Sequence, residues 1–241
     1  MISKNIWSAI LIVAVFVFVS VLSTLLFSYY IISQDHRMVV MAQTDSTESP
    51  FSLANLIEQG TPLLGDASAP ITLVDFSDFQ CHLCARYVKN TELLINDTYI
   101  QSGQVALVLK HLPNRGFDSM GAHLAAQCTN EQGMFWQFHK LLYENQRDID
   151  SGWVSQENLK KFASQISGLD VELFNSCFDS QKYKEYIEND IGLANSQGFF
   201  DTPSFILVNS NDGSDPEIIR GAQPFPSFQS IIEKKLDELK K

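Results

Sequence analysis

Basic residues and cysteines are scarce in this sequence, and each shortage narrows what the protein can do. The 241 residues include 17 lysines and arginines against 28 aspartates and glutamates, so the formal net charge is −11. An acidic chain is repelled by a phosphate backbone, and we therefore expect no nucleic-acid partner. Hydrophobic residues make up 45% of the chain and charged residues 19%, values typical of a globular rather than a disordered protein.

The few cysteines also argue against a conventional zinc site. Zinc commonly takes four ligands, from two C-x-x-C pairs or from one such pair and two histidines. The chain has one C-x-x-C, formed by Cys81 and Cys84, with no second pair and no H-x₃₋₅-H motif. Half of a zinc site remains the alternative to a redox dithiol, but we expect no bound metal. One tightly held zinc per chain in the purified protein would reverse that expectation.

A long apolar run near the N-terminus predicts a membrane anchor. Residues 6–32 are interrupted only by serine and threonine, whose hydroxyls can bond to the helix's own carbonyls, and roughly 20 residues span a bilayer. Trp7, Tyr29 and Tyr30 suit the two water–lipid interfaces. A cleaved signal peptide is the alternative, although its apolar core would be only about 7–15 residues long. Lys4 favours a cytoplasmic N-terminus, so we expect a single-pass cell-membrane protein whose C-terminal domain is extracytoplasmic.

Composition divides the chain into four parts. Residues 1–5 form a short flank, and the predicted anchor occupies residues 6–32. Residues 33–60 are polar and lack an apolar period, which is typical of a linker. Regular patterning follows, so residues 61–241 are predicted to form one domain.

The pattern in that domain predicts an α/β fold. Residues 70–76 and 105–109 are short apolar runs typical of buried strands, and a helical pattern begins between them at Cys81. Strand, helix and strand in about 40 residues form a βαβ unit. A long helical stretch follows, in which Ser155 and Asp170 are predicted N-caps. The remaining elements are strands at 204–208 and 217–220, joined by a turn at 211–213, and a helix from about residue 227.

The dithiol lies where the first strand gives way to the helix. The helix N-terminus offers unpaired N–H groups and partial positive charge, which stabilise a thiolate at Cys81. A stabilised thiolate favours the reduced form, so the disulfide becomes more oxidising. Cys84, one turn later, can attack a mixed disulfide at Cys81. His82, when cationic, would act in the same direction; the alternative is a solvated residue at the helix start.

Four segments carry a resemblance to a known family. Residues 64–87, 132–139, 202–205 and 221–225 resemble, in order, the active-site region, the helical insertion, a later strand and the start of the C-terminal helix of DsbA-type thiol–disulfide oxidoreductases. The resemblance implies a thioredoxin-like fold with an inserted all-helical subdomain, at about residues 117–198, here preceded by the predicted transmembrane helix.

The resemblance also implies roles for individual residues. Pro203 matches the family's cis-proline, which lies against the dithiol, and Thr202 would then pair with an extended substrate chain. The alternative is an ordinary proline at the start of a strand. Asp75 matches an acidic residue that can accept the proton of Cys84, and burial should raise its pKa. The alternative is an aspartate at a strand end, in water.

Two further cysteines lie in the helical insertion. In an oxidising compartment Cys128 and Cys177 would pair, and the bridge would stabilise the fold by about 4 kcal/mol on the chain-entropy model. The alternative is two buried free thiols. The sequence departs from the family's common pattern at His82, where many relatives have proline, and at Asp201, which replaces a glycine. The redox potential therefore does not carry over.

These observations lead to three functional hypotheses. The first is an oxidase that passes the Cys81–Cys84 disulfide to exported proteins with thiols. It would need no cofactor beyond that disulfide, and a membrane partner of the DsbB or vitamin K epoxide reductase type would reoxidise it. The second is a disulfide reductase or isomerase that another membrane protein keeps reduced. The third is a tethered peptide-binding, chaperone-like module in which the groove beside Thr202 matters more than the thiols.

Overall fold

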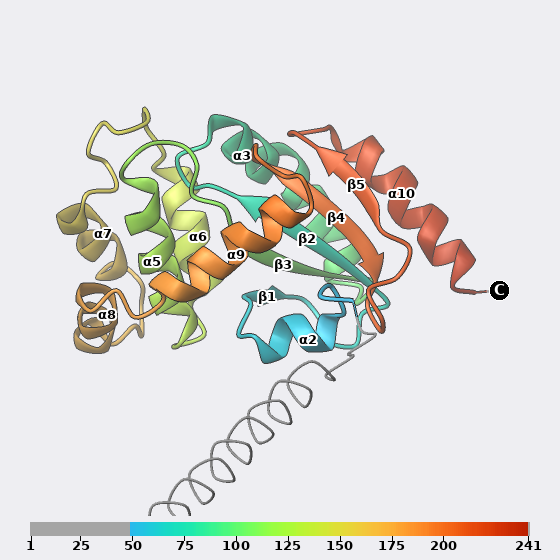
Figure 1. The fold of residues 1–241 in the computed structure, drawn as a ribbon, viewed down its shortest axis with the longest axis horizontal. Helices are drawn as coiled ribbons and strands as arrows, with labels where there is room; N and C mark the ends of the chain where they lie inside the picture. The colour runs from blue at the N-terminus through green and yellow to red at the C-terminus, as the bar shows by residue number, and fades with distance from the viewer. Residues whose placement is uncertain (1–48, 241) are drawn as a thin grey trace, which may run out of the picture. The chain divides into compact units, whose positions relative to one another are not determined.

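A five-stranded mixed sheet organises residues 49–240, the part of the chain that this computed structural model describes (Figure 1). The strand order is β1-β3-β2-β4-β5. β2 and β3 are parallel, and the other neighbouring pairs are antiparallel. The strands are β1 (Leu63–Leu64), β2 (Ile71–Ser77), β3 (Val105–His111), β4 (Ser204–Asn209) and β5 (Glu217–Arg220).

One unbroken helical run connects the two parallel strands. It consists of α3 (His82–Tyr87), the π-helix η1 (Val88–Glu92), α4 (Leu93–Ile95) and the π-helix η2 (Asn96–Ile100). The residues at the joints keep right-handed helical dihedral angles, so the run does not break. The predicted βαβ unit is therefore confirmed. Its helix begins directly after the loop that leaves β2.

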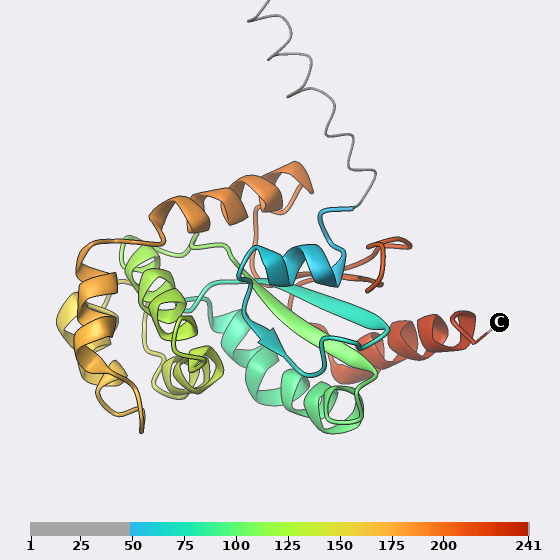
Figure 2. The same cartoon turned by 90° about the horizontal axis from the view of Figure 1, so that it is seen from below.

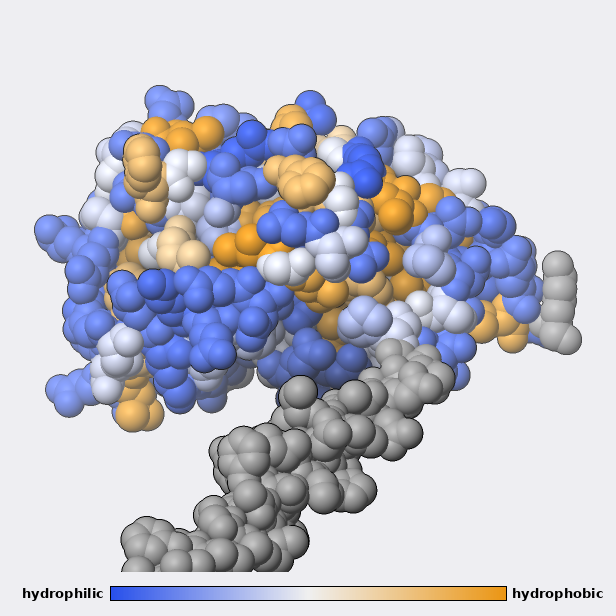
Figure 3. Space-filling view, viewed as in Figure 1, coloured by the Kyte–Doolittle hydropathy of each residue, from blue (hydrophilic) through white to orange (hydrophobic). Residues whose placement is uncertain are grey.

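Helices cover both faces of the sheet (Figure 2). Val74 and Phe76 of β2 share a buried cluster with residues of α2 (Leu53–Glu58) and α9 (Lys184–Ser196). Leu73 belongs to a second cluster, with residues of α3 and α10 (Phe225–Glu238). Successive side chains of a strand point to opposite faces, so Asp75 lies on the face that α3 covers. Toward solvent, α9 is mainly hydrophilic (Figure 3).

The expected linker is wrong at its C-terminal end. Residues 53–58, predicted to be part of a polar tether, form α2, whose start is capped by the Ser52 side chain. Leu53 and Leu56 are buried against the sheet. The predicted anchor at residues 6–32 lies outside the described residues. Within residues 49–240, no helix has the length and apolar character needed to cross a bilayer.

Four helices form the insertion between β3 and α9. The resemblance implied an insertion up to about residue 198, but α9 packs on the sheet, so the insertion ends before it. They are α5 (Ser119–Asn130), α6 (Phe135–Glu144), α7 (Gln156–Ala163) and α8 (Val171–Asp179). The side chains of Ser155 and Asp170 accept hydrogen bonds from the first turns of α7 and α8, which confirms both predicted N-caps. A disulfide between Cys128 and Cys177, with an S–S distance of 2.02 Å, ties α5 to α8.

Candidate active site

The dithiol occupies the junction between β2 and α3. Cys81 is the N-cap residue of α3, with extended backbone angles, and Cys84 lies in its first turn. The structure holds the reduced form, because both residues are free thiols. Cys81 is 3% exposed and Cys84 is fully buried. Cys81 is thus the less buried of the two residues, which fits the order of roles predicted from the sequence.

The loop before β4 lies directly against the nucleophilic sulfur. In the antiparallel pair, Phe76 of β2 lies opposite Ser204 of β4. The C-terminal end of β2 and the N-terminal end of β4 therefore lie at the same edge of the sheet. The peptide bond between Thr202 and Pro203 is cis. Sγ of Cys81 lies 3.3 Å from the carbonyl oxygen of Thr202. The structure thus brings together the two segments to which the sequence assigned the chemistry and the substrate contact.

Local hydrogen bonds stabilise the Cys81 thiolate. The pKa of Cys81 falls to about 5, chiefly because the Cys84 thiol donates a hydrogen bond to it. The hydrogen bond with Thr202 and the backbone N–H groups of Cys84 and Leu83 add to this effect, which outweighs the opposing effect of burial on the pKa. Cys81 is therefore an anion at neutral pH. An anionic sulfur is both a good nucleophile and a good leaving group.

The groups beneath Cys81 have the opposite property. Burial raises the pKa of Cys84 well above its ordinary value, and the Cys81 thiolate and Asp75, when it is ionised, raise it further. Asp75 is 1% exposed, and burial likewise raises its pKa well above the usual range. Neither carboxylate oxygen of Asp75 has a hydrogen-bond partner among the described residues. Burial thus favours the protonated, neutral form of both Cys84 and Asp75.

Asp78 is a functional residue that the sequence reasoning missed. Its Oδ1 accepts hydrogen bonds from the N–H of Gln80 and the hydroxyl of Ser119, each at 2.8 Å. Its Oδ2 accepts from the N–H groups of Asn114 and Arg115, each at 2.7 Å. Asp78 therefore fastens the loop before the dithiol to the loop after β3. Its position directly after a strand was visible in the sequence, but its partners were not.

Asn114 extends this network to the loop that carries the cis bond. Its side-chain amide donates to the carbonyl of Phe200 at 2.9 Å, and its Oδ1 accepts from the Thr202 hydroxyl at 3.2 Å. On the surface, Arg115 pairs with Asp201 at 3.0 Å. Three loops, from β2, β3 and the start of β4, are thus joined around the nucleophilic sulfur.

The rim of the site is partly apolar. Leu83, between the two cysteines, is 41% exposed, and Phe200, two residues before Thr202, is 68% exposed. His82 is also exposed, so the structure places it at the solvated start of α3. Its predicted influence on the thiol stays a prediction. Exposed apolar side chains beside a reactive sulfur provide a surface on which an unfolded chain can bind.

The chain matches the Thioredoxin_4 family model, described as thioredoxin, over residues 58–234. It belongs to the thioredoxin family. It is 27% identical over 183 residues to "Disulfide bond formation protein D" of Bacillus subtilis, covering 74% of this chain and 78% of that protein. The fold is similar to that of oxidised BdbD from Bacillus subtilis, with a TM-score of 0.66, 26% identity and 74% and 94% of the two chains covered. The fold is also similar to that of alpha-DsbA1 from Wolbachia pipientis, with a TM-score of 0.63 and 26% identity. That match covers 74% of this chain and 94% of the other.

These relatives identify the chain as a DsbA-type thioredoxin-like protein and as a disulfide oxidoreductase. The matched residues include both cysteines of the dithiol and the Thr202-Pro203 bond. The match begins after residues 6–32 and does not cover the predicted anchor. The thioredoxin-like fold with a helical insertion, predicted from the resemblance, is therefore confirmed.

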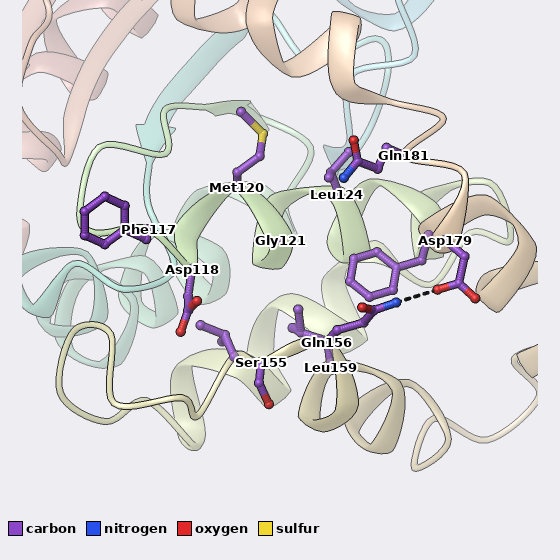
Figure 4. Close-up of a pocket in the computed structure, with 12 residues that line it drawn as sticks. Phe117, Asp118, Met120, Gly121, Leu124, Ser155, Gln156, Leu159, Asp179 and Gln181 are labelled. Atoms are coloured by element: carbon purple, nitrogen blue, oxygen red, sulfur yellow. Dashed lines mark hydrogen bonds between the residues drawn. The ribbon is translucent and has the colours of Figure 1, made fainter.

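A cavity of about 370 Å³ lies inside the helical insertion of this DsbA-type protein, away from the dithiol. Figure 4 shows its lining, from α5 on one side and α7 and the end of α8 on the other. The Gln156 amide donates to the Asp179 carboxylate at 2.8 Å across its edge. None of the residues predicted to act on thiols lines this cavity. It is not the redox site.

The donor set for a metal is also incomplete in residues 49–240. No group of three or more histidine, cysteine, aspartate or glutamate side chains there is arranged to hold an ion. Cys128 and Cys177, the other two sulfurs of this DsbA-type chain, are bonded to each other. They are therefore not free to complete a zinc site with Cys81 and Cys84.

Proposed function

We propose that this protein is an extracytoplasmic dithiol oxidase that forms disulfides in exported proteins with the Cys81–Cys84 pair. The observation that carries the proposal is the anionic character of Cys81, whose pKa is about 5. Because the thiolate is stabilised, the reduced protein is favoured, and its disulfide is a strong oxidant. A reductase would need a less stabilised thiolate, so that its disulfide form is the more stable one.

The reaction has two steps in which the sulfurs exchange partners. A substrate thiolate attacks Sγ of Cys81 in the oxidised protein, forming a mixed disulfide while Cys84 leaves with the electron pair of the broken S–S bond. A second substrate thiolate then attacks the substrate sulfur of the mixed disulfide, and Cys81 leaves as a stable thiolate. The substrate loses two electrons and the dithiol gains them.

Asp75 supplies the proton that the first step requires. The leaving sulfur of Cys84 is buried, and burial raises its pKa, so it must take up a proton. Asp75 lies on the face of the sheet that α3 covers, and burial raises its pKa, which favours the protonated form that can donate. In the reverse direction Asp75 accepts the proton as Cys84 attacks.

Thr202 and the apolar rim would hold the substrate. The loop before β4 places the backbone of Thr202 3.3 Å from Sγ of Cys81, so an extended chain bound to Thr202 has its thiol beside that sulfur. Leu83 and Phe200 add apolar contact area that does not select for a particular substrate sequence. Such a surface suits newly exported chains, which are unfolded and varied.

Location outside the cytoplasm is supported by two features. The apolar run at residues 6–32 is long enough for a single-pass anchor, which needs roughly 20 residues. The Cys128–Cys177 disulfide is of a kind that persists in oxidising compartments. A membrane protein of the DsbB or vitamin K epoxide reductase type would reoxidise the dithiol. Alkaline phosphatase fused after residue 241 should be active in whole cells, whereas an inactive fusion would refute this orientation.

Measurement of the reduction potential in glutathione buffer tests the direction of electron flow. We expect a value closer to about −120 mV than to about −270 mV, the potentials of a strong oxidant and of thioredoxin. A value near the lower figure would support the reductase hypothesis instead. Cys84→Ala should accumulate mixed disulfides with exported proteins in cells, and Cys81→Ser should form none. If Cys81→Ser keeps its function in cells, the protein is a peptide-binding module and the oxidase proposal fails.

A further inference from the structure

Two buried histidines lie beneath the loop that leads to the dithiol. His111 ends β3 and His123 lies on α5, and both are fully buried. Their Nδ1 atoms are 2.7 Å apart. Nε2 of His111 lies 3.0 Å from Oε1 of Gln127. The thiol chemistry described above uses neither histidine, yet a buried polar pair of this kind is costly unless every nitrogen has a suitable partner.

The proton positions on His111 follow from its partners. The amide nitrogen of Gln127 donates to the carbonyl of Gly60 at 3.1 Å, so Oε1 of Gln127 is the atom that faces the histidine. A carbonyl oxygen can only accept, and Nε2 of His111 must therefore carry a proton. The contact between the two Nδ1 atoms needs one further proton, because two bare nitrogens at hydrogen-bond distance repel each other.

The far end of the pair faces a carboxylate. Nε2 of His123 lies 3.9 Å from Oδ1 of Asp78 and has no hydrogen-bond partner among the described residues. Burial alone would raise the pKa of Asp78, but His123 and the donors Gln80 and Ser119 together lower it, so Asp78 is charged. A bare Nε2 would turn its lone pair toward this anion. A third proton, on Nε2, makes the contact attractive and gives the pair one positive charge.

Neighbouring charges assign that positive charge to His123. Lys110 of β3 and Asp190 of α9 form a buried ion pair at 2.9 Å, and Asp190 also accepts from the N–H of His111 at 3.0 Å. Lys110 is thus already paired and does not compensate Asp78. Burial, the charge of His123 and then the charge of Lys110 lower the pKa of His111. The anion Asp78 thus lies beside His123, and the cation Lys110 lies beside His111, so this arrangement favours the extra proton on His123.

We propose that His111 and His123 share three protons in the folded protein and that this buried cation holds Asp78 in place. Asp78 in turn fixes the loop that carries Asn114, whose side chain binds the Thr202 loop beside the nucleophilic sulfur. The two histidines are therefore positioning residues for thiol–disulfide exchange. The proton count is independent of the proposed function, whereas the effect on the thiol rests on it.

Nitrogen-15 NMR of the reduced full chain, with labelled histidine, tests the proton count directly. At pH 7 we expect three protons on the two rings. Both nitrogens of His123 should carry one, and on His111 only Nε2 should carry one. His139 is the internal reference, because it is buried and burial lowers its pKa to about 3, so its ring carries one proton. The variants His111→Gln and His139→Gln assign the signals. An unprotonated Nε2 on His123 would overturn the inference.

Alkylation of the thiol tests the positioning role. In His123→Gln the charge of Asp78 is uncompensated, the loops relax, and the Thr202 loop is no longer held in place beside the Cys81 sulfur. We expect the reaction of Cys81 with iodoacetamide at pH 5 to slow about fivefold, which corresponds to a rise of one in its pKa from about 5. His139→Gln is the matched control, because His139 packs on the same Phe79 ring as His123 but does not approach Asp78.

The outcomes separate the two proposals. Equal rates for His123→Gln and the wild-type chain would overturn the positioning role, even if the NMR spectrum shows three protons. Should wild-type Cys81 react no faster than an ordinary cysteine, the oxidase proposal fails, and the NMR spectrum still decides the proton count. If His123→Gln does not fold, the NMR spectrum of the wild-type chain carries the test.

Discussion

Asp75 and Asp78 lie three residues apart and are both buried, yet their pKa values shift in opposite directions. Asp75 is 1% exposed, has no hydrogen-bond partner among the described residues, and burial raises its pKa well above the usual range. Asp78 is fully buried, accepts four hydrogen bonds, and has a lowered pKa. Burial does not distinguish them. The supply of donors does.

Their backbone positions explain that supply. Asp75 lies inside β2, between β3 and β4, where neighbouring N–H groups are used by the sheet. Asp78 lies just beyond the strand, where the N–H groups of Gln80, Asn114 and Arg115 are free to donate. A neutral carboxyl can exchange a proton with the dithiol, and a charged one can hold loops together. One short segment thus provides both functions.

The largest effect should follow from the removal of the charged carboxylate. Asp78→Ala leaves four donors and the buried histidine cation without their acceptor. We expect the free energy of unfolding to fall by about 3–5 kcal/mol, the usual cost of breaking a buried pair from one side. Urea denaturation followed by tryptophan fluorescence measures it. Asp75→Ala is the control and should lose far less, because no hydrogen bond is broken; equal losses would contradict the comparison.

A second variant separates lost stability from a disturbed site. Cys128→Ala combined with Cys177→Ala opens a loop with a sequence separation of 49 residues, and the chain-entropy model gives a loss of about 4 kcal/mol. The bridge lies in the helical insertion, so we expect the Cys81 alkylation rate at pH 5 to stay unchanged. Asp78→Ala should lose similar stability and also slow alkylation. A slower reaction in the disulfide variant would mean that general destabilisation, and not Asp78, governs the site.

Replacement of the neutral carboxyl should affect the rate and leave stability intact. Asp75→Asn keeps the shape of the side chain but cannot exchange a proton with Cys84. We expect the oxidation of a peptide dithiol to slow by about 100-fold, within the range for loss of a general acid or base. Stopped-flow fluorescence measures this rate, and urea denaturation should show a free energy of unfolding no lower than that of the wild-type chain. A wild-type rate would remove Asp75 from the mechanism.

The sequence predicted the parts of this site that depend on local pattern. Cys81 at a strand–helix junction, a buried strand that carries Asp75, and a loop with Thr202 before a later strand all follow from periodicity and from a short ordered set of motifs. The structure has each of them where the pattern predicts it. Local pattern also gave the N-caps of α7 and α8.

Pattern failed where the partner is distant or the element is short. Asp78 finds Asn114 and Arg115 more than thirty residues away, and His111 finds His123 on another element. No spacing rule predicts such pairs. The helix α2 has six residues, too few to show a helical period, and so its segment was predicted to be linker. Its two buried leucines were the available signal.

The smallest effect, a difference in pH dependence, would sharpen the comparison most. The lowered pKa of Asp78 stabilises the fold above the pKa of an unfolded aspartate, about 3.9, and this stability is lost as the pH falls through the folded value. The raised pKa of Asp75 has the opposite sign. The folded state keeps a proton that the unfolded state loses, so stability falls as the pH rises from about 4 toward the folded pKa.

Each carboxyl can change the free energy of unfolding by at most about 1.4 kcal/mol per pH unit. Urea denaturation between about pH 3 and pH 8 should therefore show two separate changes of slope. Asp75→Asn should remove the decline above about pH 4, and Asp78→Asn should flatten the acid side below it. The double variant should show both changes, because the two residues act on separate networks. If both single variants alter the same side of the profile, donor supply does not divide the two aspartates into a neutral proton donor and a charged anchor.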